Sequence, residues 1–268
     1  MKSIVILSLL ILSYSTSAQV HSDRNEFKIF SNYLKDSLQI QLRLPDKIDS
    51  NKDSISLLIL LDGSEYFGIA SDAIDKYEFA ELTPNIVIVS LPSTRESRWT
   101  YYTPTKAKKT ANYTDSEDLY NRTGQFSAYS LFVQEELIPF IENKLNTKFT
   151  TKTIFGHSLG GLGAFCFFAL KPDIFNNYII ASASSLFDEY YIIKEIEKIK
   201  KHSFSKLFLS VAEYEMNGYV ENTEFLYETI SKNKSDKNKL KYVLYENQGH
   251  AEVGLQTLLD GIKFVYKK

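Results

Sequence analysis

The residues best suited to chemistry lie in the short segment Gly156 to Gly161, which reads G-H-S-L-G-G. Within it, Ser158 has one glycine two positions before it and another two positions after it. A serine on a sharp turn between a strand and a helix needs this spacing, because side chains at the two flanking positions would clash in the turn. Such a turn lifts the serine Oγ above the sheet, at the positive end of the following helix. The segment therefore predicts that Ser158 is a nucleophile.

A glycine-rich turn between a strand and a helix can also bind the phosphate groups of a nucleotide. The chain has neither G-x-G-x-x-G nor G-K-[ST], which are the patterns that nucleotide sites of this kind use. The nucleophile is therefore the better interpretation of this turn.

A serine hydroxyl needs a base to take its proton, and the sequence has four histidines. His21 lies near the start of the chain, and His202 follows a lysine-rich helix end. His157 is the neighbour of the serine, and the turn should direct its side chain away. His250 remains, in a loop after the last predicted strand, where the carboxyl edge of the sheet would place it beside the serine. We predict that His250 is the general base.

An acid must orient the imidazole, and in hydrolases with this serine turn it lies between the serine and the histidine in the sequence. Glu213 and Glu215 both follow the predicted strand 206–211. We favour Glu215, because a few turn residues are needed before a side chain can bend toward the histidine. Asp188 and Glu189, after the preceding strand, are further candidates. At this point Glu213 stays open as the alternative.

The negative oxygen that forms when a serine attacks an ester needs two backbone N–H donors. Leu159, the residue after the predicted nucleophile, should supply one of them at the start of the following helix. We expect the other from Ser64, in the turn Leu61 to Ser64 that leaves a buried strand.

The elements that must position these residues follow from apolar runs and turn signals. Residues 26–31 and 37–44 predict two strands of an antiparallel hairpin. Residues 55–61 (ISLLILL) and 85–90 (NIVIVS) are continuous apolar runs, typical of parallel strands covered on both faces. Further predicted strands at 151–155, 178–181, 206–211 and 240–245 alternate with predicted helices at 134–143, 159–170, 187–200, 220–232 and 253–266. The pattern predicts one α/β domain, with a mostly parallel sheet, an N-terminal antiparallel hairpin and helices on both faces.

One segment, residues 92–125, has no clear period and is rich in aromatic and basic side chains. Loops of that length without secondary structure are uncommon unless they form a lid or a binding loop. We expect Arg98 and Trp99, which lie in it, to bind substrate. The alternative is a surface excursion without a role in binding.

The composition excludes several other classes of protein. The 268 residues are 44% hydrophobic and 14% aromatic, which is typical of a globular chain and not of a disordered one. There are 31 basic and 33 acidic side chains, with a formal charge of −2 and no block of five like charges. A nucleic-acid partner is therefore not expected, because phosphate neutralisation needs a concentrated basic face.

The first 18 residues predict a secretory signal peptide. Lys2 gives a positive start, residues 4–12 are almost wholly apolar, and Thr16-Ser17-Ala18 supplies small residues for cleavage. A membrane-spanning helix needs about 20 apolar residues, and this run has roughly half of that, so a stable membrane anchor is not expected. We predict export to the periplasm or the cell exterior after cleavage near Ala18, which leaves residues 19–268 as an α/β-hydrolase domain.

These stretches together resemble the putative esterase family of α/β-hydrolases, which includes enterochelin-type siderophore esterases, feruloyl and acetyl-xylan esterases, and esterase D. The similar stretches are residues 60–67 (LLDGSEYF), Arg95 to Arg98 followed by Tyr102-Thr103-Pro104, residues 136–142 (ELIPFIE), Gly156 to Gly161, and residues 171–175 (KPDIF). The resemblance implies one hydrolase domain without a metal or other cofactor. It also implies that Ser158, Glu215 and His250 match the family's triad.

The residues and the resemblance predict a serine carboxylic-ester hydrolase that acts on a small-molecule ester through an acyl-enzyme. A narrower hypothesis is a catecholate siderophore trilactone as substrate, because the cations of segment 92–125 could face an anionic iron complex while Trp99 stacks on its rings. Feruloyl esters would need the aromatic side chains but not the cations. A different class remains open as well, namely a catalytically silent binding protein on the same fold, although a serine, an acid and a histidine in the right order favour the enzyme.

Overall fold

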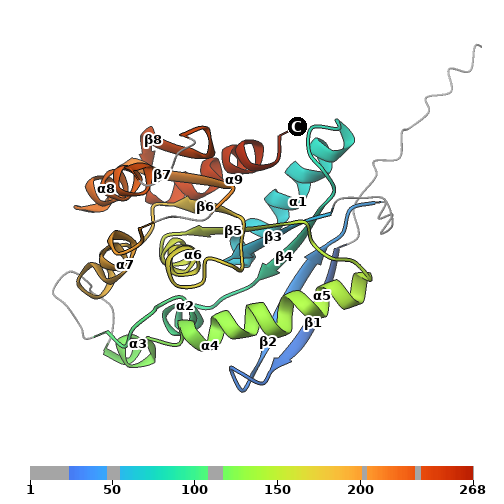
Figure 1. The fold of residues 1–268 in the computed structure, drawn as a ribbon. Coiled ribbons are helices and arrows are strands. Elements are labelled where there is room, and N and C mark those ends of the chain that lie inside the picture. The colour runs from blue at the N-terminus through green and yellow to red at the C-terminus, as the bar shows by residue number, and fades with distance from the viewer. Residues whose placement is uncertain (1–23, 47–54, 108–116, 201–203, 233–236, 268) are drawn as a thin grey trace, which may run out of the picture.

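The computed structural model describes residues 24–46, 55–107, 117–200, 204–232 and 237–267 (Figure 1). The predicted signal peptide therefore lies outside the described residues. One sheet of eight strands forms the centre of the described chain, in the order β1-β2-β4-β3-β5-β6-β7-β8. This α/β fold with a mostly parallel sheet confirms the predicted fold class.

The sheet begins with the predicted antiparallel hairpin and continues as a parallel sheet. Strand β1 (Arg24–Ser31) pairs with β2 (Asp36–Arg43), and β2 runs antiparallel to β4 (Ile86–Leu91). All later pairings are parallel. The remaining strands are β3 (Ser56–Leu61), β5 (Thr151–His157), β6 (Asn177–Ala181), β7 (Lys206–Tyr214) and β8 (Leu240–Gly249).

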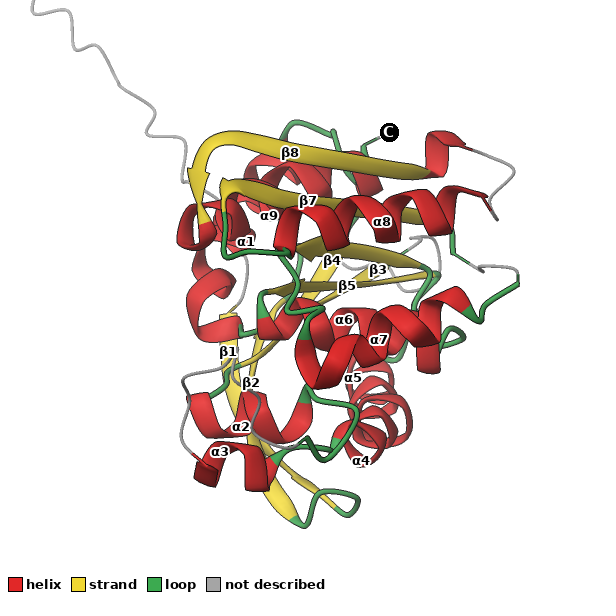
Figure 2. Ribbon diagram, turned by 90° about the vertical axis from the view of Figure 1, so that its left-hand side faces the viewer, coloured by secondary structure: helices red, strands yellow, loops and turns green. Residues whose placement is uncertain are grey.

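Helices cover both faces of the sheet, as predicted (Figure 2). On one face lie α1 (Gly63–Phe79) and α9 (His250–Tyr266), which contact each other. The other face is covered by α6 (Leu159–Leu170), α7 (Phe187–Glu197) and α8 (Tyr219–Lys232), and by a rod made of α4 (Phe126–Leu131), the π-helix η1 (Phe132–Leu137) and α5 (Ile138–Leu145). Two short helices, α2 (Arg95–Tyr101) and α3 (Glu117–Arg122), and the 3₁₀ turn η2 (Lys237–Lys239) complete the described elements.

Three differences between the structure and the sequence-based prediction concern elements near the predicted site. Helix α1 was not predicted at all, because only one narrow stripe of it is apolar and buried. Segment 92–125 is not a structureless loop where it is described, since α2 and α3 lie within it. Helix α9 begins at His250, three residues before its predicted start, because the side chain of Glu252 accepts a hydrogen bond from the N–H of Gly249 at 2.7 Å and caps the helix.

The sheet buries apolar side chains on both faces. In β3, Leu57, Ile59 and Leu61 belong to the core that faces α6, whereas Leu58 and Leu60 belong to the core that faces α1 and α9. All five side chains are fully buried. This two-sided burial explains why the strand is a continuous apolar run in the sequence.

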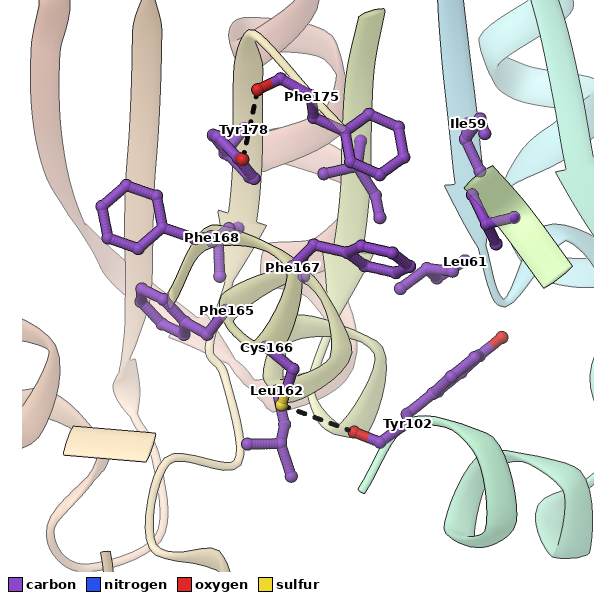
Figure 3. Close-up of a cluster of buried hydrophobic side chains, with 14 of the residues drawn as sticks. Ile59, Leu61, Tyr102, Leu162, Phe165, Cys166, Phe167, Phe168, Phe175 and Tyr178 are labelled. Atoms are coloured by element: carbon purple, nitrogen blue, oxygen red, sulfur yellow. Dashed lines mark hydrogen bonds between the residues drawn. The ribbon is translucent and has the colours of Figure 1, made fainter. Parts of the chain in front are cut away.

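Helix α6 is buried on every side, which fits its almost purely apolar sequence. Phe165, Phe167 and Phe168 point in different directions from it into the surrounding core (Figure 3). Cys166, the single cysteine of the chain, is fully buried on the same helix, and its Sγ lies 3.9 Å from the carbonyl oxygen of Tyr102.

The C-terminal half of helix α1 is joined to the sheet by a buried arginine. Arg43, at the end of β2 and 1% exposed, donates hydrogen bonds to Asp75 at 2.6 and 3.0 Å and to Glu78 at 2.6 and 3.0 Å. It also donates to the carbonyl of Ile86 at 2.7 Å, and the N–H of Ile86 donates to Glu78 at 2.7 Å. Arg43 therefore ties α1 to β2 and to the first residue of β4.

Candidate active site

Ser158 lies on a sharp turn between β5 and α6, with φ 57° and ψ −117°. The turn brings Gly156 against Gly160 so closely that a Cβ at Gly156 would lie 2.1 Å from the Gly160 carbonyl oxygen. A Cβ at Gly161 would lie 2.9 Å from the Cα of Ala183. These close approaches are the physical reason for the glycines that flank the serine in the sequence.

Neighbouring strands hold the backbone of this turn. The N–H of Ser158 donates to the carbonyl of Ala181 at the end of β6, at 3.0 Å. The Ser158 carbonyl accepts from the N–H groups of Leu162 at 3.0 Å and Ser184 at 2.9 Å. The left-handed φ of a non-glycine residue is unfavourable by itself, and these bonds hold it in place.

His250, at the start of α9, contacts Ser158. Its Nε2 lies 2.8 Å from the Oγ of Ser158. The residue is the first of α9 and follows β8 directly, so a helix and not a loop carries the imidazole. The structure thus brings together the two residues that the sequence singled out as nucleophile and base, which are 92 positions apart.

Glu215 approaches the opposite nitrogen of the same imidazole. Its two carboxylate oxygens lie 2.8 and 2.9 Å from Nδ1 of His250, and its side chain is 1% exposed. Glu213 points elsewhere, because the pairing of β7 with β8 shifts register between Ala212 and Tyr214. The carboxylate of Glu213 accepts from the N–H of Asn247 at 2.7 Å. Of the two candidate acids, the structure therefore places Glu215 at the histidine.

The other two candidate acids, Asp188 and Glu189, lie at the start of α7. Asp188, at the start of α7, accepts a hydrogen bond from the hydroxyl of Thr105 at 2.5 Å. Asp188, Glu189 and Tyr190 all have left-handed backbone angles. This contact ties the beginning of α7 to the segment that follows α2.

Two rings fix the position of the His250 imidazole. The ring of Tyr219 meets it edge-on, with the centroids 5.7 Å apart, and the Tyr219 hydroxyl is 3.1 Å from the Ser184 Oγ. The ring of His157 lies on another side, with its centroid 4.8 Å from that of His250. The sequence did not predict either contact.

His157 is itself buried, and it contacts helix α1. Its Nδ1 lies 2.8 Å from the hydroxyl of Tyr66, and 7% of the residue is exposed. Burial, together with the nearby His250 and Arg98, lowers the pKa of His157 to about 3. The imidazole is therefore neutral at physiological pH.

The two predicted oxyanion donors both lie at helix starts. Leu159 opens α6 and Ser64 is the second residue of α1, and N–H groups in a first turn have no acceptor within their own helix. The two starts are packed together, because a Cβ at Gly160 would lie 2.5 Å from Oδ2 of Asp62, the residue just before α1. The amides of the two first turns could thus serve one ligand oxygen.

Arg98 and Trp99 contact the protein itself. Nε of Arg98 lies 2.8 Å from Oδ1 of Asp62, and its Nη2 donates to Oδ2 at 2.9 Å. Trp99 is 5% exposed and packs against Tyr120 and Phe187, with ring centroids at 5.2 and 6.1 Å. The observed contacts of both side chains are those of a structural support.

Asp62 is the buried acid of this region that the sequence analysis did not single out. It is 3% exposed, and its Oδ1 also accepts from the Ser93 hydroxyl at 2.7 Å. Burial raises the pKa of this carboxyl, while the Arg98 guanidinium and the Ser93 hydroxyl oppose that rise. A signal was present in the sequence, because an acid directly after a buried strand lies at the sheet edge where sites gather.

The described part of the chain lacks two further kinds of feature, a metal-binding cluster and a membrane-spanning helix. It contains no cluster of three or more His, Cys, Asp or Glu residues that could hold a metal ion. No helix in the same described ranges has the length and apolar character needed to cross a membrane.

The geometry around Ser158 can support one kind of chemistry well. A hydroxyl in contact with an imidazole, whose second nitrogen meets a carboxylate, can pass its proton to the imidazole as it attacks an electrophilic carbon. Amides in the first turns of two adjacent helices could stabilise the negative oxygen that results.

Comparison with known proteins places this geometry in context. A family model described as "Putative esterase" matches residues 31–250. The ferri-bacillibactin esterase BesA of Bacillus subtilis is 24% identical over 214 residues, which cover 74% of this chain and 74% of that protein. Among solved structures, the BES protein from Bacillus cereus superimposes with a TM-score of 0.75 at 23% identity over 100% of both chains. An IroE-like serine hydrolase from Shewanella oneidensis gives a TM-score of 0.77 at 22% identity, covering 90% of this chain and 79% of that one.

Proposed function

Because the chain belongs to the putative esterase family and is a carboxylic ester hydrolase, we propose that it cleaves its substrate through an acyl-enzyme formed on Ser158. The observation that carries this proposal is the pair of contacts made by His250. Its Nε2 lies 2.8 Å from the Ser158 Oγ, and its Nδ1 lies 2.8 Å from Glu215. Both contacts are within the distance that proton transfer and orientation of the imidazole require.

In the first half of the reaction, Oγ of Ser158 attacks the ester carbonyl carbon while its proton moves to Nε2 of His250. The carbonyl oxygen becomes negative and is held by the N–H groups of Leu159 and Ser64. The C–O bond to the alcohol then breaks, and the proton on Nε2 passes to the leaving oxygen. Glu215 keeps the proton of Nδ1 in place and stabilises the imidazolium.

In the second half, a water molecule takes the place of the alcohol. His250 removes one proton from this water as its oxygen attacks the acyl carbon, and the second tetrahedral intermediate uses the same two amides. The bond between Oγ of Ser158 and the acyl carbon breaks, and the proton returns from Nε2 to Oγ. The carboxylic acid leaves and the enzyme is restored.

The nucleophile is tested by Ser158→Ala. We expect hydrolysis of p-nitrophenyl acetate to fall by several orders of magnitude without loss of fold, because the three groups act as one unit. A fluorophosphonate should add one mass increment to the wild-type chain and none to the variant. Retention of more than about a tenth of the wild-type turnover would contradict the serine mechanism.

The acid is tested by a matched pair of variants two positions apart. Glu215→Gln should lower kcat by roughly 10² to 10⁴, because the amide no longer fixes the imidazole tautomer. Glu213→Gln should leave kcat nearly unchanged, since that carboxylate accepts a hydrogen bond from the N–H of Asn247 in β8 and not from His250. The reverse order of effects would assign the role to Glu213.

A narrower proposal concerns the substrate, which we infer to be a catecholate siderophore ester. It is supported by the name of the relative that is 24% identical, a ferri-bacillibactin esterase. The test compares turnover of a ferric catecholate trilactone, methyl ferulate and p-nitrophenyl acetate by the purified protein. A kcat/KM for the trilactone no higher than that for methyl ferulate would remove this assignment, and absence of turnover for all three would favour a silent binding protein.

We propose as well that the segment 1–18 directs export. The support is the positive start, the apolar run of residues 4–12 and the small residues up to Ala18. Expression of the full chain in a secreting bacterium, followed by mass measurement of the exported protein, should give an N-terminus at Gln19. An intact N-terminus on protein retained in the cytoplasm would contradict export.

A further inference from the structure

We propose that Asp62 and Arg98 are positioning residues that set the spacing between the two oxyanion-binding amides, Ser64 and Leu159. The inference rests on the proposed serine mechanism and adds two side chains to it. It also assigns Arg98 a role different from that of a cation for an anionic substrate.

The chain turns sharply at Asp62, just before the Ser64 amide. Asp62 has φ 58° and ψ 41°, a left-handed conformation that residues with a side chain rarely adopt. The following Gly63 is pressed against β4, where a Cβ would lie 1.7 Å from the Oγ of Ser90. A change at Asp62 would therefore change the direction in which the first amides of α1 point.

The carboxylate of Asp62 has a partner on each oxygen. Nη2 of Arg98 donates a hydrogen bond to Oδ2 at 2.9 Å, and its Nε lies 2.8 Å from Oδ1 as an ion-pair contact, so the guanidinium holds the carboxylate in position. The hydroxyl of Ser93 adds a third contact at 2.7 Å. In addition, the backbone N–H of Asp62 donates to the hydroxyl of Tyr102 at 3.3 Å.

The same pair also touches the turn that carries the nucleophile. Nη2 of Arg98 lies 3.5 Å from the carbonyl oxygen of His157, the residue before Ser158. Oδ2 of Asp62 occupies the space beside Gly160, in the first turn of α6. The pair therefore contacts both elements whose amides must converge, the loop before α1 and the turn before α6.

A contact of this kind should act on the transition state more than on substrate binding. The negative oxygen exists only after attack, so a displaced amide lowers kcat while KM changes little. The effect should also be the same for a small neutral ester and for a large aromatic one. A cation that bound the substrate would instead raise KM, and only for anionic substrates.

The experiment compares Asp62→Asn, Arg98→Lys and the double variant Asp62→Asn/Arg98→Met with the wild type. Removal of Arg98 alone would leave a buried carboxylate without its cation and could prevent folding, whereas the double variant removes both charges. The matched control is Arg122→Ala, since Arg122 forms an ion pair with Asp118 in the same segment but is half exposed. Thermal melting reports folding for each variant.

For the double variant we expect kcat on p-nitrophenyl acetate and on methyl ferulate to fall about 10- to 100-fold, with KM changed less than about threefold. The affinity for an aryl trifluoromethyl ketone, whose adduct with Ser158 bears a negative oxygen, should fall by the same factor as kcat/KM. Asp62→Asn and Arg98→Lys should give intermediate losses, and Arg122→Ala should match the wild type.

Three outcomes would overturn the inference. A folded double variant with wild-type kcat would show that the pair does not position the amides. A loss confined to KM for anionic aromatic esters would make Arg98 a substrate-binding residue. If the wild-type protein neither hydrolyses esters nor reacts with a fluorophosphonate, that result would contradict the proposed function, and the positioning role would fall with it.

Discussion

Helix α1 is held near each end by an arginine that pairs with carboxylates, yet the two pairings serve different purposes. In the C-terminal half of α1, Asp75 and Glu78 bond to Arg43, which is 1% exposed, and both lie far along the helix from Tyr66, the α1 residue that contacts His157. At its start, Arg98 bonds to Asp62, beside the turn that carries Ser158. One interaction type thus joins α1 to the sheet at one end and orients the proposed oxyanion loop at the other.

The difference lies in what each arginine touches besides the helix. Arg43 belongs to β2 and donates to the carbonyl of Ile86, so its loss would loosen the packing of α1 on the sheet. Arg98 contacts the backbone of His157, so its loss would move groups next to the nucleophile. Of these two arginines, we therefore expect Arg43 to contribute more to stability and Arg98 to contribute more to turnover.

The largest expected effect on stability comes from Arg43→Met. The variant leaves Asp75 and Glu78 without their shared buried cation, which should lower the free energy of unfolding by about 3 to 5 kcal/mol. Urea denaturation measures this loss. The kcat of the variant, assayed at a temperature where it stays folded, should remain within about a factor of two of the wild type, since no contact of Arg43 reaches the serine. A large loss of kcat without a loss of stability would erase the distinction between the two ends.

A smaller effect should appear as a pH dependence at the start of α1, where Tyr66 contacts His157. The pKa of His157 is about 3 in the folded chain, against an ordinary value near 6.5. As pH falls below about 6.5, the unfolded chain takes up a proton that the folded chain does not, so stability is lost toward acid pH.

The measurement is the difference in unfolding free energy between wild type and His157→Asn from pH 7 down to pH 4. The wild type should lose on the order of 1.4 kcal/mol per pH unit more than the variant over the lower part of this range. Other acid effects are common to both chains and cancel. Parallel curves would mean that His157 takes up its proton in the folded chain as readily as in the unfolded chain.

The smallest effect should come from Arg24→Ala. Arg24 pairs with Asp72, which is 72% exposed, and with Asp75, which is 13% exposed and is already paired with Arg43; Arg24 itself is 32% exposed. Exposed pairs of this kind contribute about 1 kcal/mol or less to stability. Urea denaturation of the variant should therefore give a curve close to that of the wild type, and a loss as large as that of Arg43→Met would show that burial is not what separates the two pairs.

The strands and the serine turn were predictable because their signals are local. The run ISLLILL of residues 55–61 indicates a strand buried on both faces, and Gly156 to Gly161 reflects the steric demands of one turn. Helix α1 was not predictable in the same way. Its buried stripe consists mainly of Tyr66, Ala70 and Ile74, and the polar residues and Gly68 between them weaken the helical pattern.

The contacts within the site depended on information that no short window of sequence contains. Asp62 and Arg98 are 36 positions apart, and nothing in the spacing of either residue predicts their pairing. The sequence favoured Glu215 over Glu213 from the number of turn residues after the strand, whereas the register shift between Ala212 and Tyr214 is visible only in the assembled sheet. Sequence therefore indicated which residue types gather at the sheet edge, and the structure was needed to show which of them meet.

The single cysteine gives the protein a natural reporter of its own opening. Cys166 lies in the middle of α6, the helix that starts just after Ser158, and it is fully buried. Burial also raises the pKa of its thiol well above the ordinary value, so the reactive thiolate is scarce while the helix is packed. A thiol reagent can therefore modify this chain only when α6 separates from its neighbours. The rate of that modification would measure, without any engineered label, how often the helix behind the nucleophile unfolds.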